Sequence, residues 1–161
     1  MAKTMMEATR LVPCSVVILS VGTKDKRDAM TATAMFVSEK PPLLTVSVAK
    51  HILSHDLIDR TGEFVLNVAS FDQVKLAAQL GATHGAKVDK FKKFKLKTAK
   101  ATHIQSPLIK DSYANLECRV ITSMTAATYT VYLAEVVACQ VNRESEPIAW
   151  FDNTYCSLKK L

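Results

Sequence analysis

The stretch TYTVYLAEVVACQV, residues 128–141, decides the fold class of this chain. Large side chains recur along it at every second position, which is the period of a β-strand. The residues that share one face in this way are Tyr129, Val131, Leu133, Val137, Cys139 and Val141. The preceding segment Leu116–Thr122 has the same β-branched character, which favours strands. The C-terminal third of the chain is therefore predicted to be rich in β-structure.

Similar segments occur throughout the rest of the chain and are bounded by charged turns or by prolines. The further predicted strands are Ser15–Val21, Met30–Val37, Leu43–Val48, Phe64–Val68 and a short one at Ile148–Trp150. So many strands with only a few short helices cannot form a βαβ repeat. We therefore expect a mainly β protein, an antiparallel barrel with short helical insertions.

The helical insertions are predicted from their end signals. One helix should span Leu53–Arg60 and close at Gly62, and another should span Asp72–Leu80. In the second helix, Asp72 is the expected N-cap and Gly81 the expected residue after the C-cap. A short helix at 89–94 interrupts an otherwise irregular stretch from 81 to 112. Loops of this length in a compact domain are often functional.

Length and composition exclude several classes of protein. The 161 residues are expected to form one domain, 1–161, and 48% hydrophobic with 22% charged residues argues against a disordered or fibrous chain. Apolar runs such as Val16–Leu19 are far shorter than the ~20 residues of a membrane span. The N-terminal residues do not resemble a secretory signal. We expect a soluble cytoplasmic protein that has no contact with a membrane.

The net charge of +6 comes from one segment. Seven lysines and one acid, Asp89, lie between Lys87 and Lys100, whereas the remainder of the chain is neutral. This segment is either a solvated surface or a site for an anion, such as a phosphate-bearing ligand or nucleic acid. Phe91 and Phe94 lie among the lysines, but an ordinary amphipathic segment with two buried phenylalanines has the same pattern.

No metal site is predicted. The four cysteines, at positions 14, 118, 139 and 156, are far apart and form no ligand pair, so we expect inert free thiols in the core. His51 and His55 would share a helix face, but no carboxylate motif accompanies them.

Two short segments are candidates for ligand binding. The first, DAMTATAM at 28–35, combines small side chains, which let a flat ligand approach the backbone, with the hydroxyls of Thr31 and Thr33. An edge strand with alternating threonines would have the same sequence. The second, VSVAK at 46–50, precedes a helix start at Ser54, where free backbone N–H groups suit a phosphate. Lys50 or His51 could add positive charge, although Ser54 is equally consistent with an ordinary helix cap.

Taken in order, these segments and several later ones resemble the flavin reductase-like family of FMN-binding split barrels. The resemblance covers about residues 10–158, and no single motif in it is specific. The matching segments are 28–33, 41–48, SHDLI at 54–58, TGEFVLNV at 61–68, VDKF at 88–91, SPLI at 106–109, ANLECRV at 114–120, YLAEV at 132–136 and WFDNTY at 150–155.

The resemblance implies an antiparallel split barrel, a homodimer and one FMN per subunit near the dimer interface. Carried over by position, it places two groups of residues around the flavin. The first group lines the ring: Ala29, Met30, Thr31, Ala32 and Thr33. The second group holds the ribityl chain and the phosphate: Ser47, Val48, Ala49, Lys50 and Ser54. Lys90 and Phe91 would approach a flavin as well, which gives part of the lysine excess a role.

One departure from the family pattern affects the expected activity. Many members that use a nicotinamide have a Gly-Asp-His stretch before the penultimate long strand, and here the matching residues are Ala127, Thr128 and Tyr129. Tyr129 is thus the candidate beside the nicotinamide site, but a phenol cannot carry the charge of an imidazole. Three hypotheses remain: an NAD(P)H-dependent flavin or ferric reductase, an FMN electron-transfer protein reduced by a redox protein partner, and, least favoured, a nucleic-acid-binding barrel.

Overall fold

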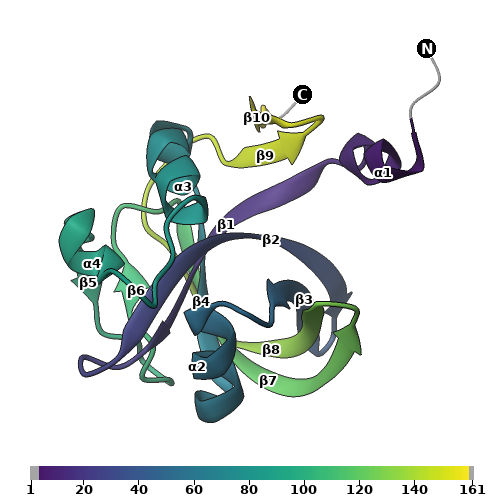
Figure 1. Cartoon of the computed structure of the whole chain (residues 1–161). Helices are drawn as coiled ribbons and strands as arrows, with labels where there is room; N and C mark the ends of the chain where they lie inside the picture. Colours follow the sequence, from purple (N-terminus) through teal and green to yellow (C-terminus); the bar gives the residue numbers. More distant parts are fainter. Residues whose placement is uncertain (1–3, 160–161) are drawn as a thin grey trace.

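A computed structural model of the chain describes residues 4–159, and its centre is a closed barrel of six antiparallel strands (Figure 1). In the order of pairing, the strands are β1 (Cys14–Gly22), β2 (Arg27–Glu39), β3 (Pro42–Ala49), β8 (Tyr129–Val141), β7 (Ala114–Ala126) and β4 (Glu63–Val68). β4 pairs back onto β1 and closes the barrel. The predicted mainly β barrel is confirmed.

The other elements surround this barrel. They are β5 (Thr98–Ala99), β6 (Leu108–Ile109), β9 (Ile148–Phe151), β10 (Thr154–Ser157), α1 (Met5–Ala8), α2 (Leu53–Thr61), α3 (Val74–Gly81), α4 (Lys90–Lys93) and two 3₁₀ turns, Thr9–Leu11 and Phe71–Gln73. β9 and β10 extend the sheet beyond β1, while β5 and β6 form a separate pair. No helix within residues 4–159 is long and apolar enough to cross a membrane.

Along each barrel strand, successive side chains point alternately into the barrel and away from it. Val17, Leu19 and Val46 point into the barrel, where Leu57 and Ile58 of α2 join them. On β8 the buried residues are Thr130, Tyr132 and Ala134, so the predicted face that begins at Tyr129 is the outer one. The sequence period therefore locates the strand but does not show which of its faces is buried.

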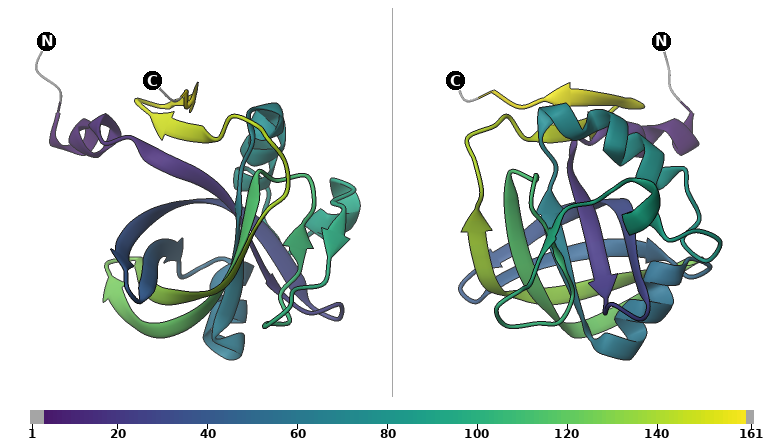
Figure 2. Two further views of the ribbon diagram at one scale, coloured as in Figure 1. Left: turned by 180° about the vertical axis from the view of Figure 1, so that it is seen from behind. Right: turned by 90° about the vertical axis from the view of Figure 1, so that its left-hand side faces the viewer.

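A second core lies outside the barrel. Val16, Ile18 and Ala29 face outward from β1 and β2 and pack against Ala77 of α3 and Phe91 of α4. The side view in Figure 2 shows α3 and the segment around α4 against this part of the barrel wall. This arrangement leaves the neighbouring outer surface of β2, β3 and β8 open beside the end of α3.

Three local predictions are wrong. Asp72 is not an N-cap, because Ser70 caps a 3₁₀ turn and α3 begins only at Val74. Gly81 is the last residue of α3 rather than the residue after its cap. The cysteines are all free, but Cys139 is exposed, whereas burial raises the pKa of the Cys118 thiol to about 12. Gly62 does close α2, in the left-handed conformation with φ of 66°.

Candidate functional site

A groove runs along the outer side of β2 and consists of three adjoining hollows that share lining residues. Its first section, here called the apolar end, has a volume of about 380 Å³. Strands β2, β3 and β8 form its floor, and the end of α3 and strands β9 and β10 border it. Its lining residues are Val16, Met30, Thr31, Ala32, Thr33, Ser47, Ala49, Gly81, Tyr129, Trp150 and Tyr155.

A middle section of about 230 Å³ continues this groove. It shares Met30, Thr31 and Tyr129 with the apolar end. His84 and Gly85 line it from the loop that follows α3. This loop therefore forms one wall of the middle section.

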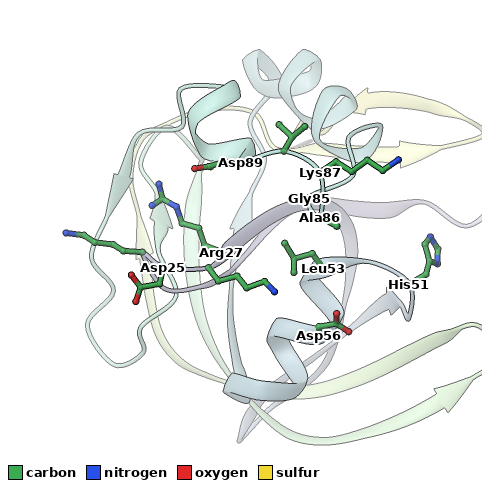
Figure 3. Close-up of a pocket in the computed structure, with 12 residues that line it drawn as sticks. Asp25, Arg27, His51, Leu53, Asp56, Gly85, Ala86, Lys87 and Asp89 are labelled. Atoms are coloured by element: carbon green, nitrogen blue, oxygen red, sulfur yellow. The ribbon is translucent and has the colours of Figure 1, made fainter.

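The third section, here called the basic end, has a volume of about 510 Å³. Figure 3 shows its lining, with Gly85, Ala86 and Lys87 on one side and Leu53, Asp56 and His51 on the other. The full lining is Lys24, Asp25, Lys26, Arg27, His51, Leu53, Asp56, Gly85, Ala86, Lys87, Val88 and Asp89. Four lysine and arginine side chains and His51 thus lie near three carboxylates, and this excess of basic residues favours an anion.

The apolar end combines flat side chains with free hydroxyls. The rings of Trp150 and Tyr155 meet edge to face with their centroids 4.9 Å apart, and burial raises the pKa of the Tyr155 phenol, which keeps it protonated. Thr33 and Ser47 are exposed, whereas the Thr31 hydroxyl donates a hydrogen bond of 2.5 Å to the carbonyl of Ala77. This end can hold a flat, partly polar ring.

The structure brings most of the predicted flavin-site residues together at the apolar end. They include Ser47 and Ala49, which the resemblance assigns to the ribityl chain and the phosphate, and Tyr129, the candidate beside the nicotinamide. Those that line the apolar end are Met30, Thr31, Ala32, Thr33, Ser47, Ala49 and Tyr129. Ala29 and Val48 are fully buried in the two cores, so only their backbone atoms are available to a ligand in the groove. Lys50 is exposed and does not belong to the lining of any of the three sections, whereas its neighbour His51 lines two of them.

The expected serine cap is wrong. Ile52 occupies the N-cap position of α2, and Ser54 lies within the first turn of the helix. The Ser54 side chain is fully buried, and its hydroxyl donates a hydrogen bond of 2.7 Å to Oδ2 of Asp28. This hydroxyl therefore joins α2 to β2 beneath the groove and is not exposed to a ligand.

Lys90 and Phe91 are buried, unlike most residues of the lysine-rich segment. Lys90 lines the middle section, but only 4% of the residue is exposed, and its ammonium lies 3.1 Å from Oδ1 of Asp28. Phe91 is buried in the outer core, with the Arg27 guanidinium 4.2 Å from its ring centroid. Phe94 packs partly into the same core. Neither ring forms an exposed platform on which nucleic-acid bases could stack.

Two partly buried polar contacts join α2 to β8. His55 Nε2 lies 2.8 Å from the Thr130 hydroxyl, and the Tyr132 phenol donates a hydrogen bond of 2.6 Å to Asp59. Burial and this bond to Asp59 raise the pKa of Tyr132. His51 precedes α2, so it does not form the helical pair with His55 that its spacing suggested.

Sequence reasoning missed the contributors to the basic end and the aromatic border of the apolar end. Lys24, Lys26 and Arg27 come from the turn between β1 and β2, and Trp150 and Tyr155 come from the last two strands. Three bases within residues 24–27 were the available signal. Their relevance could not be recognised before the turn was placed opposite Lys87.

The chain matches a known protein family over nearly its whole length. Residues 9–159 match the model of the flavin reductase like domain. The reductase component of an FADH(2)-dependent resorcinol hydroxylase from Rhizobium sp. is 28% identical over 151 residues, which cover 92% of this chain and 82% of that protein.

Two solved structures have the same fold. Flavoredoxin of Desulfovibrio vulgaris (Miyazaki F) has a TM-score of 0.88 at 20% identity, covering 100% of this chain and 95% of that one. The NADH:FAD oxidoreductase of Streptomyces globisporus C-1027 has a TM-score of 0.86 at 23% identity, covering 97% and 92%.

Proposed function

This chain belongs to the flavin reductase like family of oxidoreductases, and from that premise we propose that it binds FMN in the groove along β2 and reduces it with NAD(P)H. The observation that carries the proposal is the polarity of the groove, which is apolar and aromatic at one end and basic at the other. A flavin mononucleotide has the same polarity, with a flat ring joined by a ribityl chain to a phosphate. The activity of this protein would then be that of a flavin reductase or of a ferric reductase.

The residues at the two ends fit the two parts of this cofactor. Met30, Thr31 and Ala49 line both the apolar end and the middle section, so their positions suit the ring and the start of the chain. We place the phosphate at the basic end, near Lys24 and Lys87. This placement replaces Ser54, whose hydroxyl is already bonded to Asp28.

Bound FMN would supply the chemistry itself, by accepting a hydride at N5 of its ring. The protein then has three tasks. Trp150 and Tyr155 border the ring site and limit its contact with water. The hydroxyls of Thr33 and Ser47 can bond to the polar edge of the ring. Positive charge at the basic end binds the phosphate and so fixes the ring in place. None of these tasks requires a catalytic triad.

Tyr129 is the candidate beside the nicotinamide. It lines both the apolar end and the middle section, and 47% of the residue is exposed. Its ring can stack against a nicotinamide or donate a hydrogen bond from its hydroxyl, but it cannot supply a positive charge.

The lack of a positive charge on Tyr129 favours a second candidate function. In it, the protein carries electrons through FMN and receives them from a redox protein rather than from NAD(P)H. The tyrosine at position 129 is the specific observation in its support, and the similarity of the fold to flavoredoxin is consistent with it.

We also propose that two copies associate as a homodimer. Large apolar side chains are exposed on the curved part of the sheet where β2, β3, β8 and β7 pair, namely Met35, Phe36, Val37, Ile121 and Met124. An exposed apolar patch of this kind marks an interaction surface. Sedimentation velocity should give twice the monomer mass, and Phe36→Glu should shift it toward the monomer. A wild-type monomer at micromolar concentration would contradict this part of the proposal.

The experiment that tests the main proposal has two steps. Titration with FMN, followed by desalting and a visible spectrum, should show bound flavin, with riboflavin binding more weakly. Anaerobic mixing of the complex with NADH or NADPH should then bleach the flavin absorbance. Bleaching by a reduced redox protein but by neither nicotinamide would select the second candidate function. Failure to bind FMN or FAD would contradict both.

A further inference from the structure

The carboxylate of Asp28 lies at a junction of three elements that line the groove. Only 1% of Asp28 is exposed. Its Oδ2 accepts the hydrogen bond from Ser54 of α2, and its Oδ1 lies 3.1 Å from the ammonium of Lys90 at the start of α4. Asp28 itself belongs to β2, two residues before Met30, which lines the groove.

Lys90 makes a second contact with the same strand. Its ammonium donates a hydrogen bond of 2.7 Å to the carbonyl of Ala29, so it is bound to both a side chain and the backbone of β2. The pair is almost completely removed from water, with side-chain exposures of 3% for Lys90 and 2% for Asp28. Separation of such a pair is unfavourable, because it leaves a buried, uncompensated charge.

Gly85 provides an independent observation that the loop between α3 and α4, residues 82–89 and here called the wall loop, lies close against this carboxylate. A Cβ atom at position 85 would lie 2.2 Å from Oδ1 of Asp28, which no real contact allows. Gly85 lines both the middle section and the basic end. The loop therefore approaches Asp28 where the middle section of the groove meets the basic end.

We propose that Asp28 and Lys90 are positioning residues for the flavin site, and that their buried ion pair fixes the wall loop, residues 82–89, against β2 and the start of α2. This inference rests on the proposed function only for the identity of the ligand. The loop supplies Gly85, Ala86 and Lys87 to the groove, and the pair anchors its C-terminal end. A displacement of this loop would change the width of the middle section and move Lys87 away from the phosphate.

A purely structural role for the pair predicts a different result. It would lower the resistance of the whole protein to unfolding without changing flavin affinity at temperatures where the protein is folded. A positioning role predicts that flavin affinity falls and that the loop opens locally while the barrel remains intact. The two roles are therefore separated by measurements on folded protein.

The test compares Asp28→Asn, Lys90→Met and the double variant with wild type. The double variant removes both charges together, so it leaves no uncompensated charge if a single variant fails to fold.

With folding verified by circular dichroism, we expect the Kd for FMN to rise at least tenfold in each folded variant. Trypsin should cleave after Lys87 at least ten times faster, which reports on the loop without any flavin. Lys90→Arg, which keeps the charge, should remain within threefold of wild type in both measurements.

Lys97→Met is the matched control, because it removes the same charge from an exposed ion pair, 3.6 Å from Asp111. It should change neither measurement. A folded double variant with wild-type FMN affinity and wild-type cleavage would overturn the inference while leaving the proposed function intact. If the wild type binds no flavin, the cleavage rates still decide whether the pair holds the loop. Hydrogen exchange of residues 84–90 in the wild type that is as fast as in the turn 23–26 would also overturn it.

Discussion

The two ends of the groove are built in different ways. The floor of the apolar end consists of regular strands, with Thr31 and Thr33 on β2 and Ser47 on β3 held in register by the sheet. The basic end consists of a turn, a helix start and a loop, which meet only in the folded chain. Shape should therefore dominate at the apolar end, whereas charge should dominate at the basic end.

The largest effect should come from reversing charge at the basic end. In Lys24→Glu/Lys87→Glu, two attractions to the phosphate become repulsions, and each lost charge-assisted contact is worth about 1.5–3 kcal/mol. We expect the Kd for FMN to rise by about 100-fold or more, while the Kd for riboflavin, which lacks the phosphate, changes less than about threefold. Isothermal titration with both ligands measures this.

A matched control reverses two lysines outside the groove. Lys93→Glu/Lys95→Glu makes the same change of charge at exposed residues outside the groove lining. Its FMN affinity should stay within about threefold of wild type, because salt screens distant charges. Equal losses in both double variants would mean that the net charge of the protein, rather than the basic end, attracts the phosphate.

A smaller effect, of a different kind, should come from filling the apolar end. Ser47 is exposed at the floor of this end, so Ser47→Trp can place its ring in the hollow without disturbing the barrel interior. We expect FMN and riboflavin to lose affinity equally, by about tenfold, since overfilling a site costs about 1–3 kcal/mol. Ser47→Ala, which removes only the hydroxyl, should cost far less. A loss confined to FMN would place the ring elsewhere.

A third, still smaller effect concerns Tyr129. Tyr129→His introduces an imidazole at the position where the family pattern described in the sequence analysis has a histidine. We expect NAD(P)H-dependent flavin reduction to rise by about threefold to tenfold, in the lower range of what a positioned acid–base group contributes. Stopped-flow reduction under anaerobic conditions measures the rate. Tyr129→Phe should not raise it, and an unchanged or slower rate in Tyr129→His would remove Tyr129 from the nicotinamide site.

The smallest effect should come from Lys50→Glu. The Lys50 side chain is exposed and absent from the groove lining, although its backbone N–H donates to the carbonyl of Thr128. An exposed charge at a distance contributes little in water, so we expect less than about a twofold change in FMN affinity. A loss as large as that of the Lys24 and Lys87 double variant would restore Lys50 to the phosphate site and displace the assignment made here.

The same contrast explains what could be predicted from the sequence. The long strand at 129–141 and the small residues of 29–33 carry their signal in consecutive positions, so the barrel and the part of the apolar end on β2 could be predicted. The basic end could not, because Lys24 and Lys87 are far apart in sequence and depend on the closure of the barrel. Ser54 was misplaced because a serine at a helix start has the same sequence whether it caps the helix or bonds to a buried carboxylate.

The lysine-rich segment was only partly interpretable for a related reason. A charge run is typical of a solvated surface, and most of these lysines are exposed. Lys90 is the exception, since its burial depends on Asp28, more than sixty residues earlier in the chain. Composition can locate such a segment, but it cannot separate the one lysine that is structural from those that are free.

Trp150 borders the apolar end and is the sole tryptophan of the chain. Its emission spectrum overlaps the near-ultraviolet absorption of an oxidised flavin, so excitation of this residue can transfer energy to a ligand bound beside it. The protein consequently contains a single, fixed optical reporter at the ring site, which needs no label. Quenching of its fluorescence would follow occupancy in real time, and its recovery would follow release of the flavin during turnover.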